Sequence, residues 1–333
     1  MRAKQLKDAI KFAIKNQYPL LIKGAPGIGK TDIVAQAACE TGTELIISHP
    51  VVSDPTDFKG LPFPNKDGTS AKFLPFGDLL KLIKADKPTL FFLDDLGQAP
   101  ASVQAACMQL LLARRINGHV VSDDVTFLAA TNRRKDKAGV QGILEPVKSR
   151  FSAILELEVN IDDWVEWAIE NNLPVELIAF IRFRPNLLQN FKPTSDIINT
   201  PSPRTVANVG KMMNAHLPKD TEYEMISGAA GEGLAVELLG FLKVYRDLPD
   251  IEKLIADPMG ADVPDEPSTL FAVCGALSAK ANKKNMGNII KFTNRLPAEF
   301  QVLLLKDAIK RNKSLTNTKE FSAWAIEHAD VIL

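Results

Sequence analysis

The fold of this chain is decided by the stretch Gly24-Ala25-Pro26-Gly27-Ile28-Gly29-Lys30-Thr31. The apolar run before it, residues 18–23, predicts a strand, and apolar side chains at helical spacing over residues 31–41 predict a helix after it. A glycine-rich loop in this setting that ends in Gly-Lys-Thr is typical of a phosphate-binding loop. A chance glycine-rich turn is the simpler interpretation, but an eight-residue match between a strand and a helix argues against it. We therefore expect the chain to bind a nucleoside triphosphate.

Each residue type of this loop has a use in holding ATP. The glycines let backbone N–H groups wrap the phosphates without clashes, and the dipole of the following helix favours their negative charge. Lys30 is expected to reach the β- and γ-phosphates, and the Thr31 hydroxyl is expected to ligate Mg²⁺. Residues 24–31 are thus the predicted ATP-binding loop, with Thr31 also a predicted metal ligand.

The composition bounds the class of protein. The 333 residues suffice for one large or two ordinary domains, and 40 basic residues balance 40 acidic ones, which gives no global attraction to nucleic acid or to a membrane. No apolar run has the length of a membrane helix, and the N-terminus reads as an amphipathic helix rather than a signal sequence. Cys39, Cys107 and Cys274 are expected to be buried, reduced thiols. We expect a cytoplasmic protein with no membrane partner and no zinc site.

A second apolar run, residues 89–93, ends in the carboxylates Asp94 and Asp95. Buried parallel strands read this way, and their carboxyl ends carry the site in open α/β sheets. Asp94 is expected to hold Mg²⁺ through water, and Asp95 to polarise the attacking water. The alternative for Asp95 is a helix N-cap at the strand end.

Further strands are predicted at residues 44–48, 125–132 and 153–157. The third of these ends at Asn132, which is placed to contact the γ-phosphate or the attacking water, although a plain turn residue is the alternative. Between the strands we expect a helix over 101–115, hairpin tips at 65–68 and 117–118, and a long irregular stretch over 49–76. The fold class is therefore α/β, a five-stranded parallel sandwich over residues 1–158. The rest of the chain is predicted to be helical, with helices over 161–171 and 175–184 and another that begins around Pro203.

The order and spacing of these motifs resemble an AAA+ ATPase, whose core is a P-loop α/β/α sandwich. The phrases "DPTDFKGLP", "LDDLGQAPASVQAACMQLLL", "RRINGHV", "FLAATNR" and "PSPR" look like the MoxR branch of that family. The resemblance covers residues 1 to about 215. It implies an AAA+ core at 1–158, a helical lid with a sensor 2 residue at 159–218, and a helical C-terminal extension at 219–333 that carries no known motif.

The resemblance also assigns roles to single residues. Asn132 matches sensor 1, and Arg204 matches sensor 2 on the lid. Arg150 matches the arginine finger, which enters the site of a neighbouring subunit. Such a finger makes hydrolysis depend on a ring, typically a hexamer in this family. Asp95 matches the Walker B carboxylate that is Glu in most relatives, and the shorter side chain puts turnover in doubt. A surface ion pair is the alternative for Arg150, and a charge on the first turn of a lid helix is the alternative for Arg204. The rival finger candidates are Arg114, Arg115, Arg133 and Arg134.

The two predicted insertions, residues 49–76 and the hairpin at 117–118, match elements that face the pore or a partner in this branch. Phe58, Lys59 and Phe63 are the candidates for substrate contacts, unless the loop simply packs its own aromatic side chains. The resemblance implies a Mg²⁺-dependent ATPase that remodels a protein partner, in some cases one with a von Willebrand A-type domain. The alternatives are a nucleic-acid motor or loader, for which Lys280-Ala281-Asn282-Lys283-Lys284 is the local basic candidate, and a nucleotide-gated scaffold with little turnover.

Overall fold

The structure, a computed structural model, describes residues 1–136, 139, 142–194 and 196–328. The chain divides into two compact units, Met1–Asn160 and Ile161–Leu333, which we describe one at a time. The predicted boundary between a lid and an extension, at residue 218, falls inside the second unit and stays a prediction. The last residues of that predicted extension, 329–333, lie outside the described part of the chain.

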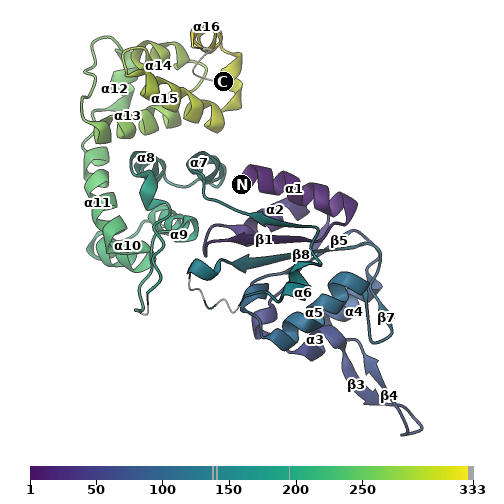
Figure 1. Cartoon of the computed structure of the whole chain (residues 1–333). Helices are drawn as coiled ribbons and strands as arrows, with labels where there is room; N and C mark the ends of the chain where they lie inside the picture. The colour runs from purple at the N-terminus through teal and green to yellow at the C-terminus, as the bar shows by residue number, and fades with distance from the viewer. Residues whose placement is uncertain (137–138, 140–141, 195, 329–333) are drawn as a thin grey trace. The chain divides into compact units, whose positions relative to one another are not determined.

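The first unit is built on a parallel sheet of five strands in the order β2-β5-β8-β1-β9 (Figure 1). The strands are β1 (Leu20–Gly24), β2 (Glu44–Ser48), β5 (Thr89–Leu93), β8 (Val125–Asn132) and β9 (Ala153–Glu156). The α/β fold predicted from the sequence is confirmed. Because all neighbours run parallel, the carboxyl ends of β1, β5 and β8 meet at one edge, and Gly24 pairs in register with Asn132.

Alternation along the strands provides a core on each face of the sheet. Ile22 and Phe92 pack with α1 (Ala3–Asn16) and α2 (Lys30–Glu40), whereas Leu21 and Phe91 pack on the opposite side. The helices of that opposite side are α3 (Pro55–Lys59), α4 (Gly77–Lys84), α5 (Ala101–Ala113) and α6 (Glu145–Lys148). Strands buried on both faces are nearly continuous in apolar residues, which is why the sequence revealed them.

Two hairpins extend this unit on the side of α3 and α5 (Figure 1). They are formed by β3 (Leu61–Pro64) with β4 (Ala71–Leu74) and by β6 (Arg115–Ile116) with β7 (His119–Val120), and both predicted hairpin tips are confirmed. In the turn of the second hairpin, Asn117 Nδ2 donates to the carbonyl oxygen of Lys59, the last residue of α3, at 2.8 Å. His119 Nε2 lies 2.7 Å from the carbonyl oxygen of Phe73. The second hairpin is thus hydrogen-bonded both to α3 and to β4 of the first hairpin.

Three expectations for this unit were wrong in part. The stretch 49–76 is less irregular than predicted, because Asp54 caps the short helix α3 and the hairpin β3–β4 follows it. Phe58, expected to contact substrate, is 3% exposed and packs in the core under α5. Cys39 is exposed, although the other two cysteines are buried as expected. In addition, α5 ends two residues early, since Arg114 takes a left-handed conformation with φ 49°.

The second unit is helical, as predicted. Its α-helices are α7 (Ile161–Glu170), α8 (Val175–Phe183), α9 (Pro203–Asn214), α10 (Glu222–Ala230), α11 (Glu232–Arg246), α12 (Ile251–Ala256), α13 (Pro267–Lys280), α14 (Met286–Thr293), α15 (Ala298–Arg311) and α16 (Lys319–Glu327). No helix among the described residues has the length and apolar character needed to span a membrane.

The helix α8 is the centre of this unit. Phe183 stacks on Phe241 of α11, with ring centroids 5.8 Å apart, and also contacts Phe271 of α13. A Cβ added to Gly275 of α13 would lie 2.8 Å from the Cβ of Ala179, so these two helices approach closely because one of them carries a glycine there. The helices that follow residue 218 therefore cover an apolar face of a helix that precedes it.

A buried ion pair reinforces the same packing. Arg182 of α8 donates to Asp307 of α15 at 2.8 Å and to Asp162 of α7 at 2.5 Å. The side chains of Arg182 and Asp307 are 12% and 7% exposed, whereas that of Asp162 is 58% exposed. Burial lowers the pKa of Arg182, but the two carboxylates outweigh burial and the pKa is raised.

Candidate functional site

The predicted phosphate-binding loop connects β1 to α2 as expected. Gly29, the residue before α2, has φ 90°, and Gly27 has φ 72°, conformations that glycine adopts without strain. A Cβ on Gly24 would lie 2.6 Å from Ile28 Cδ1, so the loop closes tightly over the end of β1. The first N–H groups of α2 have no partner within the helix, which suits an anion at this point.

The ammonium group of Lys30 lies at the carboxyl edge of the sheet. Lys30 is 7% exposed. Its Nζ donates to the Oδ1 of Asn132 at 2.7 Å and to the carbonyl oxygens of Ala25 and Gly24 at 3.0 and 3.3 Å. The loop, the lysine and the end of β8 therefore meet at one place.

The two predicted metal ligands are also brought together. The Thr31 hydroxyl donates to Asp94 Oδ2 at 2.7 Å, and Asp94 is 8% exposed. A hydroxyl and a carboxylate are the hard oxygen donors that Mg²⁺ takes from proteins beside phosphate oxygens and water. The donor set of this pair therefore fits Mg²⁺. Among the described residues, no separate cluster of three or more acidic, histidine or cysteine side chains is arranged for a metal ion.

The carboxylate of Asp95 faces the same site. Its Oδ1 accepts a hydrogen bond from Asn132 Nδ2 at 3.2 Å. Asp95 takes a left-handed conformation with φ 56° at the N-cap of the 3₁₀ helix η2 (Leu96–Gln98), but its side chain makes no capping hydrogen bond there. The geometry thus favours a carboxylate that faces the site over the N-cap alternative, and Asn132 bridges Lys30 and Asp95 rather than serving as a plain turn residue.

Arg150, the candidate finger, lies two residues after α6. Its Nη1 donates to the hydroxyl of Ser149 at 3.2 Å. Its buried Nε has no hydrogen-bond partner among the described residues. The ion pair that was the alternative for Arg150 is therefore not found within the described part of the chain.

The rival arginines differ in how far they are committed to contacts inside the unit. Arg114 donates from both terminal nitrogens to backbone carbonyls near the start of β8. Arg133 is paired with Asp136 through two hydrogen bonds of 2.8 and 3.0 Å, which raise the pKa of Arg133. Arg115 and Arg134 are exposed. Arg114 and Arg133 thus have structural roles that compete with a role in a neighbouring subunit.

Arg204, the predicted sensor 2 residue, belongs to the second unit. It lies exposed on the first turn of α9, whose N-cap Ser202 accepts a hydrogen bond from the backbone N–H of Thr205. The capped helix start is confirmed. The role of Arg204 toward a nucleotide stays a prediction.

Sequence reasoning missed one residue near the site, Gln104 on α5. It is 2% exposed, and all three of its hydrogen bonds go to backbone groups. A signal was present, because this glutamine interrupts the apolar face that Val103, Cys107 and Leu110 form. A polar residue at an apolar helical position indicates a buried group with specific partners.

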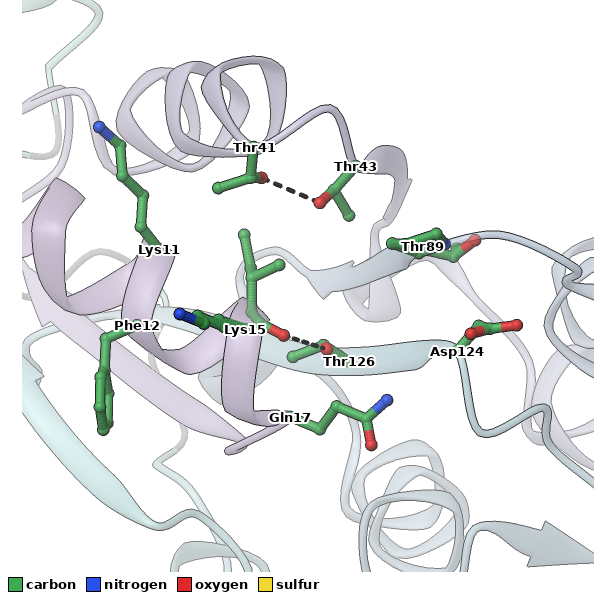
Figure 2. A pocket seen from close by; sticks show the side chains of 11 residues that line it. Lys11, Phe12, Lys15, Gln17, Thr41, Thr43, Thr89, Asp124 and Thr126 are labelled. Carbon is green, nitrogen blue, oxygen red and sulfur yellow. Dashed lines mark hydrogen bonds between the residues drawn. The ribbon is translucent and has the colours of Figure 1, made fainter.

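A cavity of about 570 Å³ lies at the opposite edge of the sheet (Figure 2). Thr89 and Thr126, at the amino ends of β5 and β8, line it together with Ile14 and Lys15 of α1. The Thr126 hydroxyl donates to the carbonyl oxygen of Ile14 at 3.4 Å. The lining includes no residue of the phosphate-binding loop, so this cavity is separate from the candidate site.

Solved structures similar to the chain include the Thermotoga maritima RuvB Holliday junction branch migration motor, at 15% identity over 82% of this chain and 80% of that one, with a TM-score of 0.39. Another is NtrX from Brucella abortus in complex with ADP, at 12% identity over 99% of this chain and 68% of that one, with a TM-score of 0.43.

The comparison with protein families is more specific. Residues 20–159 match the family model for the ATPase family associated with various cellular activities (AAA). The matched range begins at the first residue of β1 and ends after β9, so it contains the whole sheet and the five converging side chains. Residues 20–159 of this chain are therefore a domain of the AAA ATPase family.

Proposed function

We propose that this protein is a Mg²⁺-dependent ATPase of MoxR type that works as a ring, typically a hexamer, and remodels or activates a protein partner in the cytoplasm. One observation carries the ATPase proposal. Lys30, Thr31, Asp94, Asp95 and Asn132 come from a loop and two strand ends that are far apart in sequence, yet hydrogen bonds link their side chains in two groups at one edge of the sheet.

In this proposal each side chain has one task. The loop of residues 24–31 holds the phosphates through its N–H groups, and Lys30 exchanges its contact with Asn132 for the γ-phosphate. Thr31 and Asp94 would hold Mg²⁺, Asp94 through water, and the ion would supply positive charge beside the β- and γ-phosphates. Asp95 accepts a proton from the attacking water as the water oxygen bonds to the γ-phosphorus and the bond to the β-phosphate oxygen breaks. Asn132 orients that water.

The remaining two arginines complete the proposed cycle. Arg150 enters the site of the neighbouring subunit, where its planar cation offsets charge on the transferred phosphoryl group. The guanidinium group of Arg150 has no ion-pair partner among the described residues, which supports this role, because an uncommitted guanidinium group gains from an acceptor brought by another chain. Arg204 senses the γ-phosphate from the lid, and the lid shifts as phosphate is lost.

The joined hairpins support a protein partner. Phe63 is 56% exposed and Leu61 is 49% exposed on β3, and Val120 of β7 is 57% exposed. Exposed apolar side chains gathered on neighbouring hairpins are typical of an interaction surface. Phe63 and Lys59 remain the proposed contacts to the partner, which we propose to carry a von Willebrand A-type domain, and Phe58 no longer belongs to them.

The first test is the ATPase rate per subunit as a function of protein concentration, with Mg²⁺ and no partner. A rate that climbs steeply and then saturates is expected, because each site needs an arginine from a second subunit. Lys30→Ala and Arg150→Ala proteins should each be inactive, and mixing them should restore activity. A measurable rate that stays flat down to concentrations at which a mass measurement finds monomers would overturn the ring.

A nucleotide-gated scaffold with little turnover is the second candidate. The observation in its favour is Asp95 itself, one methylene shorter than Glu and bonded to Asn132. Asp95→Asn should lower the rate by about 10²-fold or more if Asp95 accepts the proton. A variant that hydrolyses ATP as slowly as the wild type would instead favour the scaffold.

A nucleic-acid motor is less well supported. Lys280, in the only basic stretch that favoured it, forms an ion pair of 2.9 Å with Glu252. Stimulation of the ATPase by DNA that falls steeply with salt would revive this alternative, because phosphate contacts release counterions. No stimulation at low salt would exclude it.

A further inference from the structure

The side chain of Gln104 fixes two backbone segments of the first unit to each other. Its Nε2 donates to the carbonyl oxygen of Ala99 at 3.0 Å and to that of Gly142 at 2.9 Å, and its Oε1 accepts from the N–H of Leu144 at 3.0 Å. A buried amide loses its hydration, and only hydrogen bonds of this kind offset that loss. The amide is therefore satisfied only while both segments stay in place.

One of these segments leads directly to Arg150. Leu144 is the N-cap of the four-residue helix α6, and the N–H of Arg150 donates to the carbonyl oxygen of Val147 in the last turn at 3.1 Å. A helix of this length has no stability of its own, so contacts from outside must fix its position. The fully buried side chain of Val147 provides one such contact, and the hydrogen bond that the N–H of Leu144 donates to Gln104 Oε1 provides another.

The other segment follows the carboxylates of the site. Ala99 is the C-cap of η2, whose N-cap is Asp95. The same turn receives the N–H of Gly142 on the carbonyl oxygen of Gly97 at 3.2 Å. A Cβ on Gly97 would lie only 2.1 Å from Thr131 Oγ1, so the turn is pressed against the end of β8 and has little room to move. Gln104 thus anchors the start of α6 to one of the most tightly packed parts of the site.

We propose that Gln104 is a positioning residue for Arg150. It holds α6 so that the guanidinium group of Arg150 is presented to the neighbouring subunit at the right place. The proposal rests on the proposed function, in which Arg150 acts on the neighbour's nucleotide. Its consequence is specific: losing Gln104 should impair the site of the neighbour and leave nucleotide binding in its own subunit unchanged.

The size of the effect follows from the kind of error introduced. A catalytic group displaced by about 1 Å costs on the order of 10²-fold in rate. Gln104→Met keeps an unbranched side chain of similar length but makes none of the three hydrogen bonds. We expect this variant to lower kcat by about 10²-fold with little change in KM or in the affinity for a fluorescent ATP analogue.

Mixed rings test whether the effect passes between subunits. In a mixture of Arg150→Ala and Lys30→Ala chains, the working sites belong to the Arg150→Ala chains and receive Arg150 from the Lys30→Ala chains. Adding Gln104→Met to the Lys30→Ala chain should abolish most of the recovered activity. Adding it to the Arg150→Ala chain should leave the recovered activity within about two-fold, since that chain's own arginine is already absent.

Each outcome decides the question. Equal losses for the two placements, or no loss when the chain that supplies Arg150 is changed, would overturn the role of Gln104 while the ring mechanism stands. If the mixture of Arg150→Ala and Lys30→Ala chains, with Gln104 intact, recovers no activity, then Arg150 does not act between subunits. The proposed role of Gln104 would then be overturned as well.

Two further variants guard against trivial explanations. Gln109 lies exposed on the same helix, so Gln109→Met makes the same chemical change at a position without these contacts. Adding it to either chain of the mixture should leave the recovered activity unchanged. If Gln104→Met does not fold, as judged by loss of ATP-analogue binding, Gln104→Asn replaces it. This variant keeps a neutral amide, but its side chain is one methylene shorter and cannot keep all three hydrogen bonds to Ala99, Gly142 and Leu144, so it should show the same dependence on placement.

Discussion

Replacing Asp307 with Asn should destabilise the second unit by about 3 kcal/mol. The carboxylate is 7% exposed and lies 2.8 Å from Arg182, which is itself 12% exposed. Removing one partner of a buried pair costs roughly 3–5 kcal/mol, because the remaining charge is left without compensation. The lower end applies here, since Arg182 keeps its contact with Asp162.

The assay uses the placement of tryptophan in the chain. All three tryptophans, Trp164, Trp167 and Trp324, belong to the second unit, so their fluorescence reports its unfolding in the full-length protein without a signal from the first. With a urea dependence of about 2–3 kcal/mol per molar, a loss of about 3 kcal/mol lowers the midpoint by about 1–1.5 M.

Asp162→Asn is the matched control, because it removes the other carboxylate that Arg182 contacts. Asp162 is 58% exposed, and exposed ion pairs contribute about 0–1 kcal/mol. The reasoning would be refuted if the two variants shifted the midpoint equally, or if Asp307→Asn shifted the stability by less than about 1 kcal/mol. Either result would mean that burial does not decide the strength of this pair.

Three further measurements follow from the structure. A thiol reagent should label the exposed Cys39 at least about ten times faster than the buried Cys107 and Cys274. Burial blocks access to the two buried thiols and raises the pKa of both, that of Cys107 to about 12. Mass spectrometry of the native protein measures the labelling rates, and equal rates would contradict this prediction. Burial also raises the pKa of Tyr245 to about 12, so as the pH rises the phenol ionises in the unfolded chain before it ionises in the folded one. The second unit should therefore lose up to about 1.4 kcal/mol of stability per pH unit between about pH 10 and 12. Urea titrations of Tyr245→Phe should not show this loss. Gly60→Ala should make residues 61–74 sensitive to protease while ATP-analogue binding persists. Gly60 has φ 81°, and the new Cβ would lie 2.7 Å from a carbonyl oxygen of β4, so the hairpin has to shift. An unchanged cleavage pattern would contradict this.

Sequence reasoning predicted the sheet and the content of the site because both depend on local patterns. Apolar runs that end in polar residues, such as the one before Asp94, are dictated by strands buried on both faces. It did not predict how the side chains are linked, since the bridge from Lys30 through Asn132 to Asp95 depends on a left-handed residue after β5 and on the registry of β1 with β8. The interruption of an apolar helix face marks Gln104 in the sequence, but two of its three partners, Gly142 and Leu144, lie 38 and 40 residues away, so the link that it makes could not be predicted.

The errors have physical explanations of their own. Phe58 lies in a five-residue helix, which is too short to show a periodic apolar face, so its burial could not be read from the pattern. Cys39 could have been placed correctly. Ile33, Ala37 and Ala38 define the buried side of α2, and the next residue along a helix points about 100° away from the last, toward solvent.

The packing around α8 decides how far this chain can be shortened. A protein that stopped near residue 218 would keep α8 but lose Phe241, Phe271 and the close contact at Gly275. Uncovering Phe180 and its neighbours would expose apolar surface worth about 1.5–3 kcal/mol for each large side chain. A chain that ended at that point would therefore expose an apolar helix face and tend to aggregate, so the C-terminal helices are needed to keep that face covered.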